Sequence, residues 1–135
     1  KQVEMEWRDQ MMRFQELFGR FPDGLNSHEH LHFFPAFSRV FIALAKEYRV
    51  GYVRFSRKGM LLPQDFTLIG KMLTVLWKRT RHLYRHAPFE TSDYLVSLDW
   101  LSDFDTFTQG IPSGTIELVV HLEREEDYRT MLEQF

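Results

Sequence analysis

The stretch "AFSRVFIALAKEYRVGYVRF" (Ala36–Phe55) decides the fold, because a helical pattern passes directly into a strand pattern. Its first part is apolar at the spacing of one helical face. Those positions are Phe37, Val40, Phe41, Leu44 and Ala45. Its last part, Val50–Phe55, is β-branched and aromatic, which predicts a strand. A helix followed by a strand is the repeating unit of α/β proteins.

The same alternation continues on both sides of this stretch. Strands that alternate with helices predict βαβ units and a mainly parallel sheet, here within one domain over residues 1–135. We expect helices at Val3–Phe18, Gln64–His86 and Glu123–Phe135, with a shorter one that Ser102 caps and Gly110 ends. We expect extended segments at Gly24–His28, Asp93–Leu98 and Gly114–Leu122.

Composition excludes several classes of function. The 135 residues carry a net charge of -2, which gives no general reason to expect nucleic acid or an anionic membrane as a partner. The basic run Lys78–His86 fits the solvated C-terminal end of a helix better than a nucleic-acid site. There is no cysteine, so disulfides and thiolate-bound zinc are excluded. No apolar run reaches the roughly 18 residues of a membrane span. We expect a cytoplasmic protein.

Half of the histidines lie in "NSHEHLHFFP" (Asn26–Pro35). In an extended segment His28, His30 and His32 would share one face, whereas in a helix only His28 and His32 would align. Either geometry can bring two imidazoles to one metal ion, and imidazole is the commonest metal ligand. The alternative interpretation is a polar loop at the end of a strand.

Three side chains should gather at one rim of the sheet, and a fourth needs a partner. Ligands of parallel sheets bind beyond the carboxyl ends of the strands. We expect His28 at the end of the first strand, Arg54 near the end of the second and His121 at the end of the last. Glu117 lies within the apolar "TIELVV" and needs a partner, either an imidazole or an arginine, unless its strand face is exposed. A hydrogen-bonded core histidine is the alternative for His121.

Three segments resemble the YdjC-like carbohydrate deacetylases, which include chitooligosaccharide deacetylase. They are "RFQELFGRFPDGLNSHEHLHFFPAF", "YRVGYVRF" and "SGTIELVVHL". The resemblance implies part of a distorted (β/α) barrel and a metal-dependent hydrolase that removes acetyl groups from N-acetylated amino sugars. The divalent ion would be Mg or Zn. The resemblance implies that His28 is a metal ligand and that His121 and Glu117 are catalytic. Arg54 would bind substrate, with Asn26, His30 and His32 as supporting residues.

The sequence also departs from the family pattern. The family's Asp-Asp segment and a further ligand histidine, both near the start of its members, are missing, Asn26 replaces an aspartate, and Leu122 replaces a proline. We therefore expect the C-terminal part of a longer deacetylase, without its catalytic base, that pairs with the N-terminal half of the barrel or forms a homodimer. The alternative is a non-catalytic relative that binds a glycan or a protein through a degenerate metal site.

Overall fold

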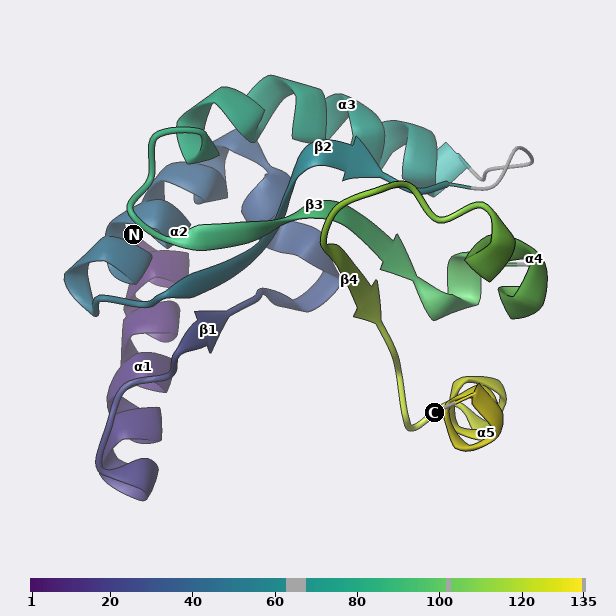
Figure 1. The fold of residues 1–135 in the computed structure, drawn as a ribbon. Helices are drawn as coiled ribbons and strands as arrows, with labels where there is room; N and C mark the ends of the chain where they lie inside the picture. The colour runs from purple at the N-terminus through teal and green to yellow at the C-terminus, as the bar shows by residue number, and fades with distance from the viewer. Residues whose placement is uncertain (63–67, 102, 135) are drawn as a thin grey trace.

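A four-stranded parallel sheet in the order β1-β2-β3-β4 forms the centre of the molecule (Figure 1). The computed structural model describes residues 1–62, 68–101 and 103–134. The sheet curls into half of a barrel, and a helix connects each strand to the next. The predicted α/β class, with a parallel sheet as part of a distorted barrel, is confirmed.

The observed elements follow the predicted alternation closely. The helices are α1 (Gln2–Phe18), α2 (Pro35–Glu47), α3 (Leu68–Tyr84), α4 (Phe104–Gln109) and α5 (Glu125–Gln134). The strands are β1 (Gly24–Leu25), β2 (Tyr52–Met60), β3 (Glu90–Ser97) and β4 (Ile116–Val119). Two 3₁₀ helices complete the chain, η1 (His28–Phe33) and η2 (Leu98–Trp100). The first residues of the helix expected at Gln64–His86 lie outside the described residues, as do Ser102 and Phe135.

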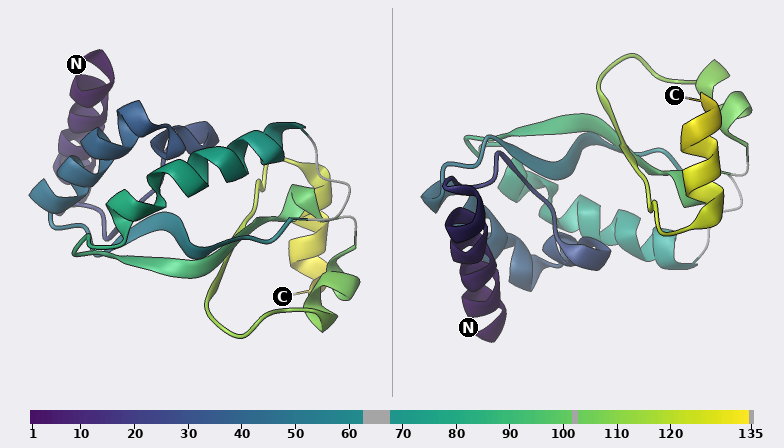
Figure 2. Two further views of the ribbon diagram at one scale, coloured as in Figure 1. Left: turned by 90° about the horizontal axis from the view of Figure 1, so that it is seen from above. Right: turned by 90° about the horizontal axis from the view of Figure 1, so that it is seen from below.

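Helices α2 and α3 cover one face of the sheet, and α4 and α5 gather at the end where β3 and β4 finish (Figure 2). Strand β2 shows how the two faces differ. Val53 and Phe55 are buried, and the Phe55 ring stacks on Tyr84 of α3 with centroids 3.8 Å apart. Because neighbouring side chains of a strand point to opposite faces, Tyr52 and Arg54 lie on the face away from the helices.

The histidine run does not adopt the expected extended conformation. Strand β1 pairs with β2 only at Gly24 and Leu25, and the chain then turns into η1. Within η1, Glu29 and His30 both have a φ of 52°, in the left-handed region. The expectation that His28 ends a strand is therefore wrong. Of the two geometries considered for the run, the extended one is not adopted, since a period of two requires extended backbone.

Two further boundaries differ from expectation. Asp103 caps α4, because its carboxylate accepts a hydrogen bond of 2.9 Å from the backbone N–H of Thr106. Strand β4 ends at Val119, so His121 lies in the loop beyond it rather than in the strand. In the described part of the chain, no helix has both the length and the apolar character that crossing a membrane requires.

Candidate functional site

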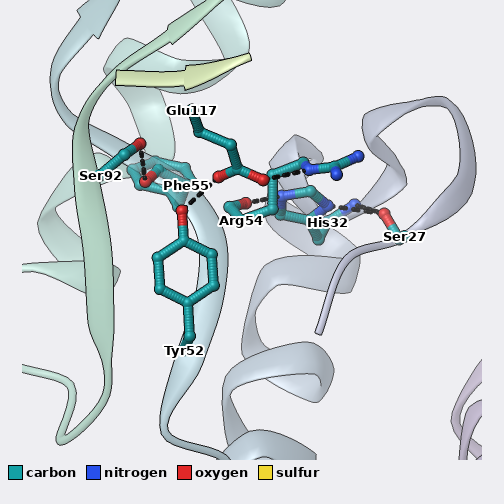
Figure 3. Close-up of polar contacts among 7 residues, drawn as sticks. All are labelled: Ser27, His32, Tyr52, Arg54, Phe55, Ser92 and Glu117. Atoms are coloured by element: carbon teal, nitrogen blue, oxygen red, sulfur yellow. Dashed lines mark hydrogen bonds and ion pairs between the residues drawn. The ribbon is translucent and has the colours of Figure 1, made fainter. Parts of the chain in front are cut away.

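A carboxylate with two partners lies on the sheet face away from α2 and α3 (Figure 3). Arg54 Nε donates to Glu117 Oε1 at 2.6 Å, and the Tyr52 hydroxyl donates to Glu117 Oε2. Glu117 comes from β4 and its partners from β2, so these side chains reach across β3. Strands two apart in a flat sheet are separated by about 10 Å. The curl of the sheet is therefore what allows this contact.

The cluster of Tyr52, Arg54 and Glu117 is only partly open to solvent. The side chains of Arg54 and Glu117 are 24% and 16% exposed, so their ion pair is less screened than a surface pair. Burial, and then the hydrogen bond to Glu117, raise the pKa of Tyr52 to about 12. Tyr52 therefore stays protonated near neutral pH and remains a hydrogen-bond donor. Sequence reasoning missed Tyr52, although its spacing of two from Arg54 on a strand could have indicated it.

His32 is buried, and both of its ring nitrogens have partners (Figure 3). Nε2 donates to the carbonyl oxygen of Arg54 at 2.5 Å, because a carbonyl can only accept. Nδ1 then accepts from the Ser27 hydroxyl at 2.6 Å. Burial lowers the pKa of His32 to about 3. His32 is thus a neutral side chain that ties η1 to the backbone of β2 beside Arg54.

His30 has the opposite arrangement, because its Nδ1 is buried and has no hydrogen-bond partner among the described residues. Its ring packs on Phe33 with centroids 5.2 Å apart. Burial, and then the positive charge of Arg54, lower the pKa of His30, and the charges of Glu117 and His121 also act on it. His30 is therefore a neutral imidazole within reach of the charges of Arg54 and Glu117, and one of its ring nitrogens has no partner among the described residues.

His121 leaves β4 toward the same region and is held by α5. Its backbone N–H donates to Asp127 Oδ2 at 2.8 Å, and its Nδ1 lies 3.7 Å from the same oxygen. That separation is too long for a hydrogen bond, and Nδ1 has no other partner in the described parts of the chain. Asp127 is itself buried. Sequence reasoning also missed Asp127, which lies in the first turn of a helix where an acidic residue has an ordinary structural explanation.

His28 lies apart from these residues. Its side chain is 90% exposed, and its nearest charged partner is Glu29, at 3.6 Å. With Asn26 it lines a groove of about 550 Å³ between α1, β1 and α2, whose other walls include Trp7 and Leu31. No hydrogen bond or ion pair joins His28 to Glu117 or to His121 within the residues described. Because the charges of Arg54, Glu117 and His121 all act on His30, these four residues lie near one another, whereas the exposed His28 is not among them.

The described residues do not by themselves assemble a metal site. Catalytic zinc sites have three protein ligands as a rule, and the described residues contain no group of three His, Cys, Asp or Glu side chains placed to hold one ion. His30 Nδ1 and His121 Nδ1 are buried imidazole nitrogens without a hydrogen-bond partner among the described residues, and imidazole nitrogen is a donor that a divalent ion would accept. Both ring nitrogens of His32 are occupied, so it would support a site only indirectly.

Comparison with known proteins gave one result. A family model described as YdjC-like protein matches residues 1–132. No curated protein and no solved structure matches the chain.

Proposed function

Because the chain belongs to the YdjC-like family, which is generally related to carbohydrate deacetylases, we propose that it forms part of a metal-dependent hydrolase. The reaction is removal of acetyl groups from N-acetylated amino sugars or oligosaccharides. One observation carries the proposal beyond the family. The ion pair of Arg54 and Glu117 lies near the unpaired ring nitrogen of His30, close enough for both charges to act on that imidazole.

A divalent ion, Mg or Zn, would polarise the acetamide carbonyl and lower the pKa of a bound water. His28 is the proposed ligand by family resemblance, and His30 offers a second donor from η1. Since three ligands are usual, the remaining ones would come from outside residues 1–135. The catalytic base would come from there as well, because Glu117 is already occupied by Arg54 and Tyr52.

The residues of this chain would bind substrate and move a proton. His121 would donate a proton to the leaving amine, and the nearby Asp127 carboxylate would stabilise the imidazolium. Arg54 uses its Nε for Glu117, so its terminal nitrogens can donate to a sugar hydroxyl or a carbonyl oxygen. Glu117 and Tyr52 would hold that guanidinium in place.

The test measures metal content and deacetylation of N-acetylglucosamine oligomers in the complete protein. We expect stoichiometric Mg or Zn that is lost in His28→Ala, and activity that falls at least about a hundredfold in His121→Gln, the range typical of a lost general acid. The matched control is His86→Gln, which replaces an exposed histidine beyond α3 and should change neither quantity.

A second candidate, a non-catalytic glycan- or protein-binding relative, is favoured by Asn26 and by the separation of His28 from the other residues. The complete protein would then hold no metal and release no acetate, yet would still bind the oligomers. Residues 1–135 alone should bind metal weakly and turn over nothing. Measurable deacetylation by this segment would contradict the inference that the base lies elsewhere.

A further inference from the structure

A second pocket, of about 310 Å³, lies on the opposite side of the sheet from Glu117. Its walls come from β2, from the end of α3 and from the start of β3. Phe55 lines it, and Phe55 points toward α3 whereas Arg54 points away. A ligand in this pocket would therefore not compete with a substrate at Arg54 and Glu117.

Three arginines, Arg57, Arg81 and Arg85, line this pocket, and each is exposed. Arg57 is anchored, because its Nε and Nη2 donate to the Thr91 carbonyl oxygen at 3.3 and 3.0 Å. Its Nη1 is left for another acceptor. The Arg81 guanidinium lies over the Trp77 ring at 5.2 Å from the centroid. Two of the three guanidinium groups are thus held by neighbours, which lowers the entropy cost of binding an anion.

The positive charge of the pocket is not balanced within the described residues. None of the three arginines takes part in an ion pair there, and Glu90 is the single carboxylate among the lining residues. The C-terminal end of α3 adds about half a negative charge. The positive charge of the three guanidinium groups therefore exceeds the negative charge of Glu90 and the helix end together.

We propose that this pocket binds the phosphate group of a small phosphorylated metabolite. Guanidinium groups match phosphate oxygens in geometry and form charge-assisted hydrogen bonds with them. Besides the polar Ser56 and Thr91, the lining includes apolar and aromatic side chains that suit the carbon part of such a molecule, namely Phe55, Tyr84, Ala87 and Phe89. The concave shape favours a compact ligand over an extended polyanion.

The test is calorimetric titration of the complete protein with pyrophosphate and with inorganic phosphate at fixed ionic strength. We expect saturable binding with one site, tighter for pyrophosphate. Arg81→Gln and Arg85→Gln should each weaken it about tenfold, as expected when a charge-assisted hydrogen bond is lost. Arg81→Lys keeps the positive charge but lacks the planar guanidinium group. Its affinity for pyrophosphate should therefore fall less than that of Arg81→Gln. All of these positions are exposed, and thermal melts should show intact folding.

The matched control is Arg79→Gln, which removes one positive charge from an exposed position of α3 that does not line the pocket. Pyrophosphate affinity should remain within about twofold in that variant, by charge screening. An equal loss in Arg79→Gln and Arg81→Gln would overturn the proposal, because binding would then report net charge alone. Absence of saturable binding at millimolar pyrophosphate would overturn it as well. So would oligonucleotide binding that is tighter than pyrophosphate binding and falls steeply with salt.

Discussion

Two histidines of one short run, His28 and His32, have opposite environments although they are four residues apart. His32 is fully buried and bonded at both ring nitrogens, whereas the His28 side chain is 90% exposed. The sequence shows that the histidines lie together, but it does not show which of them is buried and which is exposed. The partners of His32 are the hydroxyl of Ser27, just before η1, and a backbone carbonyl of β2, and only the folded chain brings β2 there.

His32 should make stability depend on pH. The pKa of His32 is about 3 in the folded protein against an ordinary 6.5, with burial as the main cause. Below pH 6.5 the unfolded chain gains a proton that folded His32 does not accept until about pH 3, so folding weakens as the pH falls. The free energy of unfolding should drop by about 1 kcal/mol between about pH 7.5 and about pH 5.5, as measured by urea denaturation.

The variant His32→Gln removes this titration while keeping a donor for the Arg54 carbonyl. It should lower the free energy of unfolding at neutral pH and reduce its pH dependence in that interval. Burial also lowers the pKa of His30, so His30 makes stability fall as the pH falls, in the same direction as His32. Some pH dependence of the free energy of unfolding should therefore persist in His32→Gln. The exposed His86→Gln should retain the full pH dependence. If the free energy of unfolding of His32→Gln falls with falling pH as steeply as that of the unchanged protein, His32 is not the source of the pH dependence.

Glu117 illustrates what a sequence can predict about one residue. A carboxylate in an apolar strand requires a partner, and of the two partners considered, the arginine is the one observed. Which arginine it is depends on the curl of the sheet, which local pattern does not encode. His121 was expected to end the last strand, and it lies two residues beyond the end of β4. The contact of its backbone N–H with Asp127 depends on how α5 packs back, which the sequence pattern does not show.

At the scale of elements, the connection before β4 sets the register of β3 against β4. The Asp93 N–H donates to the Thr115 carbonyl at 3.0 Å, and Asp93 Oδ2 accepts from the Thr115 N–H at 3.2 Å. Gly114 precedes this pair with a φ of +139°, and a Cβ added there would lie 2.5 Å from Asp93 Oδ2. Only glycine fits both the backbone conformation and the space.

Gly114→Ala should therefore destabilise the protein by about 2 kcal/mol, through backbone strain and loss of the Asp93 contact. Thermal or urea unfolding measures this change. Gly110→Ala is the matched control, because Gly110 has a φ of -112° and its nearest neighbour to an added Cβ is 3.9 Å away. Its effect should stay within about 0.5 kcal/mol. Equal destabilisation by the two substitutions would contradict the role assigned to Asp93.

Element types were predictable where periodicity was long, as in α1, α2 and α3. Strand β1 was predicted too long, because backbone pairing with β2 stops after Leu25 and η1 begins soon after it. Glu29 and His30 adopt the left-handed backbone conformation, which is unusual for residues other than glycine. No local sequence pattern predicts that conformation at these two positions. They are held by tertiary contacts, among them the buried His32 that follows.

For the whole molecule, alternation of helices and strands was enough to predict a parallel sheet, because parallel strands need crossover connections. The barrel curvature came from the family resemblance and not from periodicity. The half barrel leaves two outer strands, β1 and β4, each with one edge that pairs with no strand in the described ranges. Strand β1 is only two residues long, which limits pairing at its edge, whereas β4 has four.

We therefore expect residues 1–135, studied alone, to self-associate through the β4 edge. Sedimentation velocity should show an average mass that rises with protein concentration across the micromolar range. Leu118→Lys adds a charge to the edge strand and should shift the protein toward monomer, because edge lysines oppose strand pairing. Leu132→Lys adds the same charge to α5 at a side chain that is 67% exposed, and it should leave association unchanged. If Leu132→Lys dissociates the protein and Leu118→Lys does not, the contact involves α5 and the sheet edge is covered in some other way.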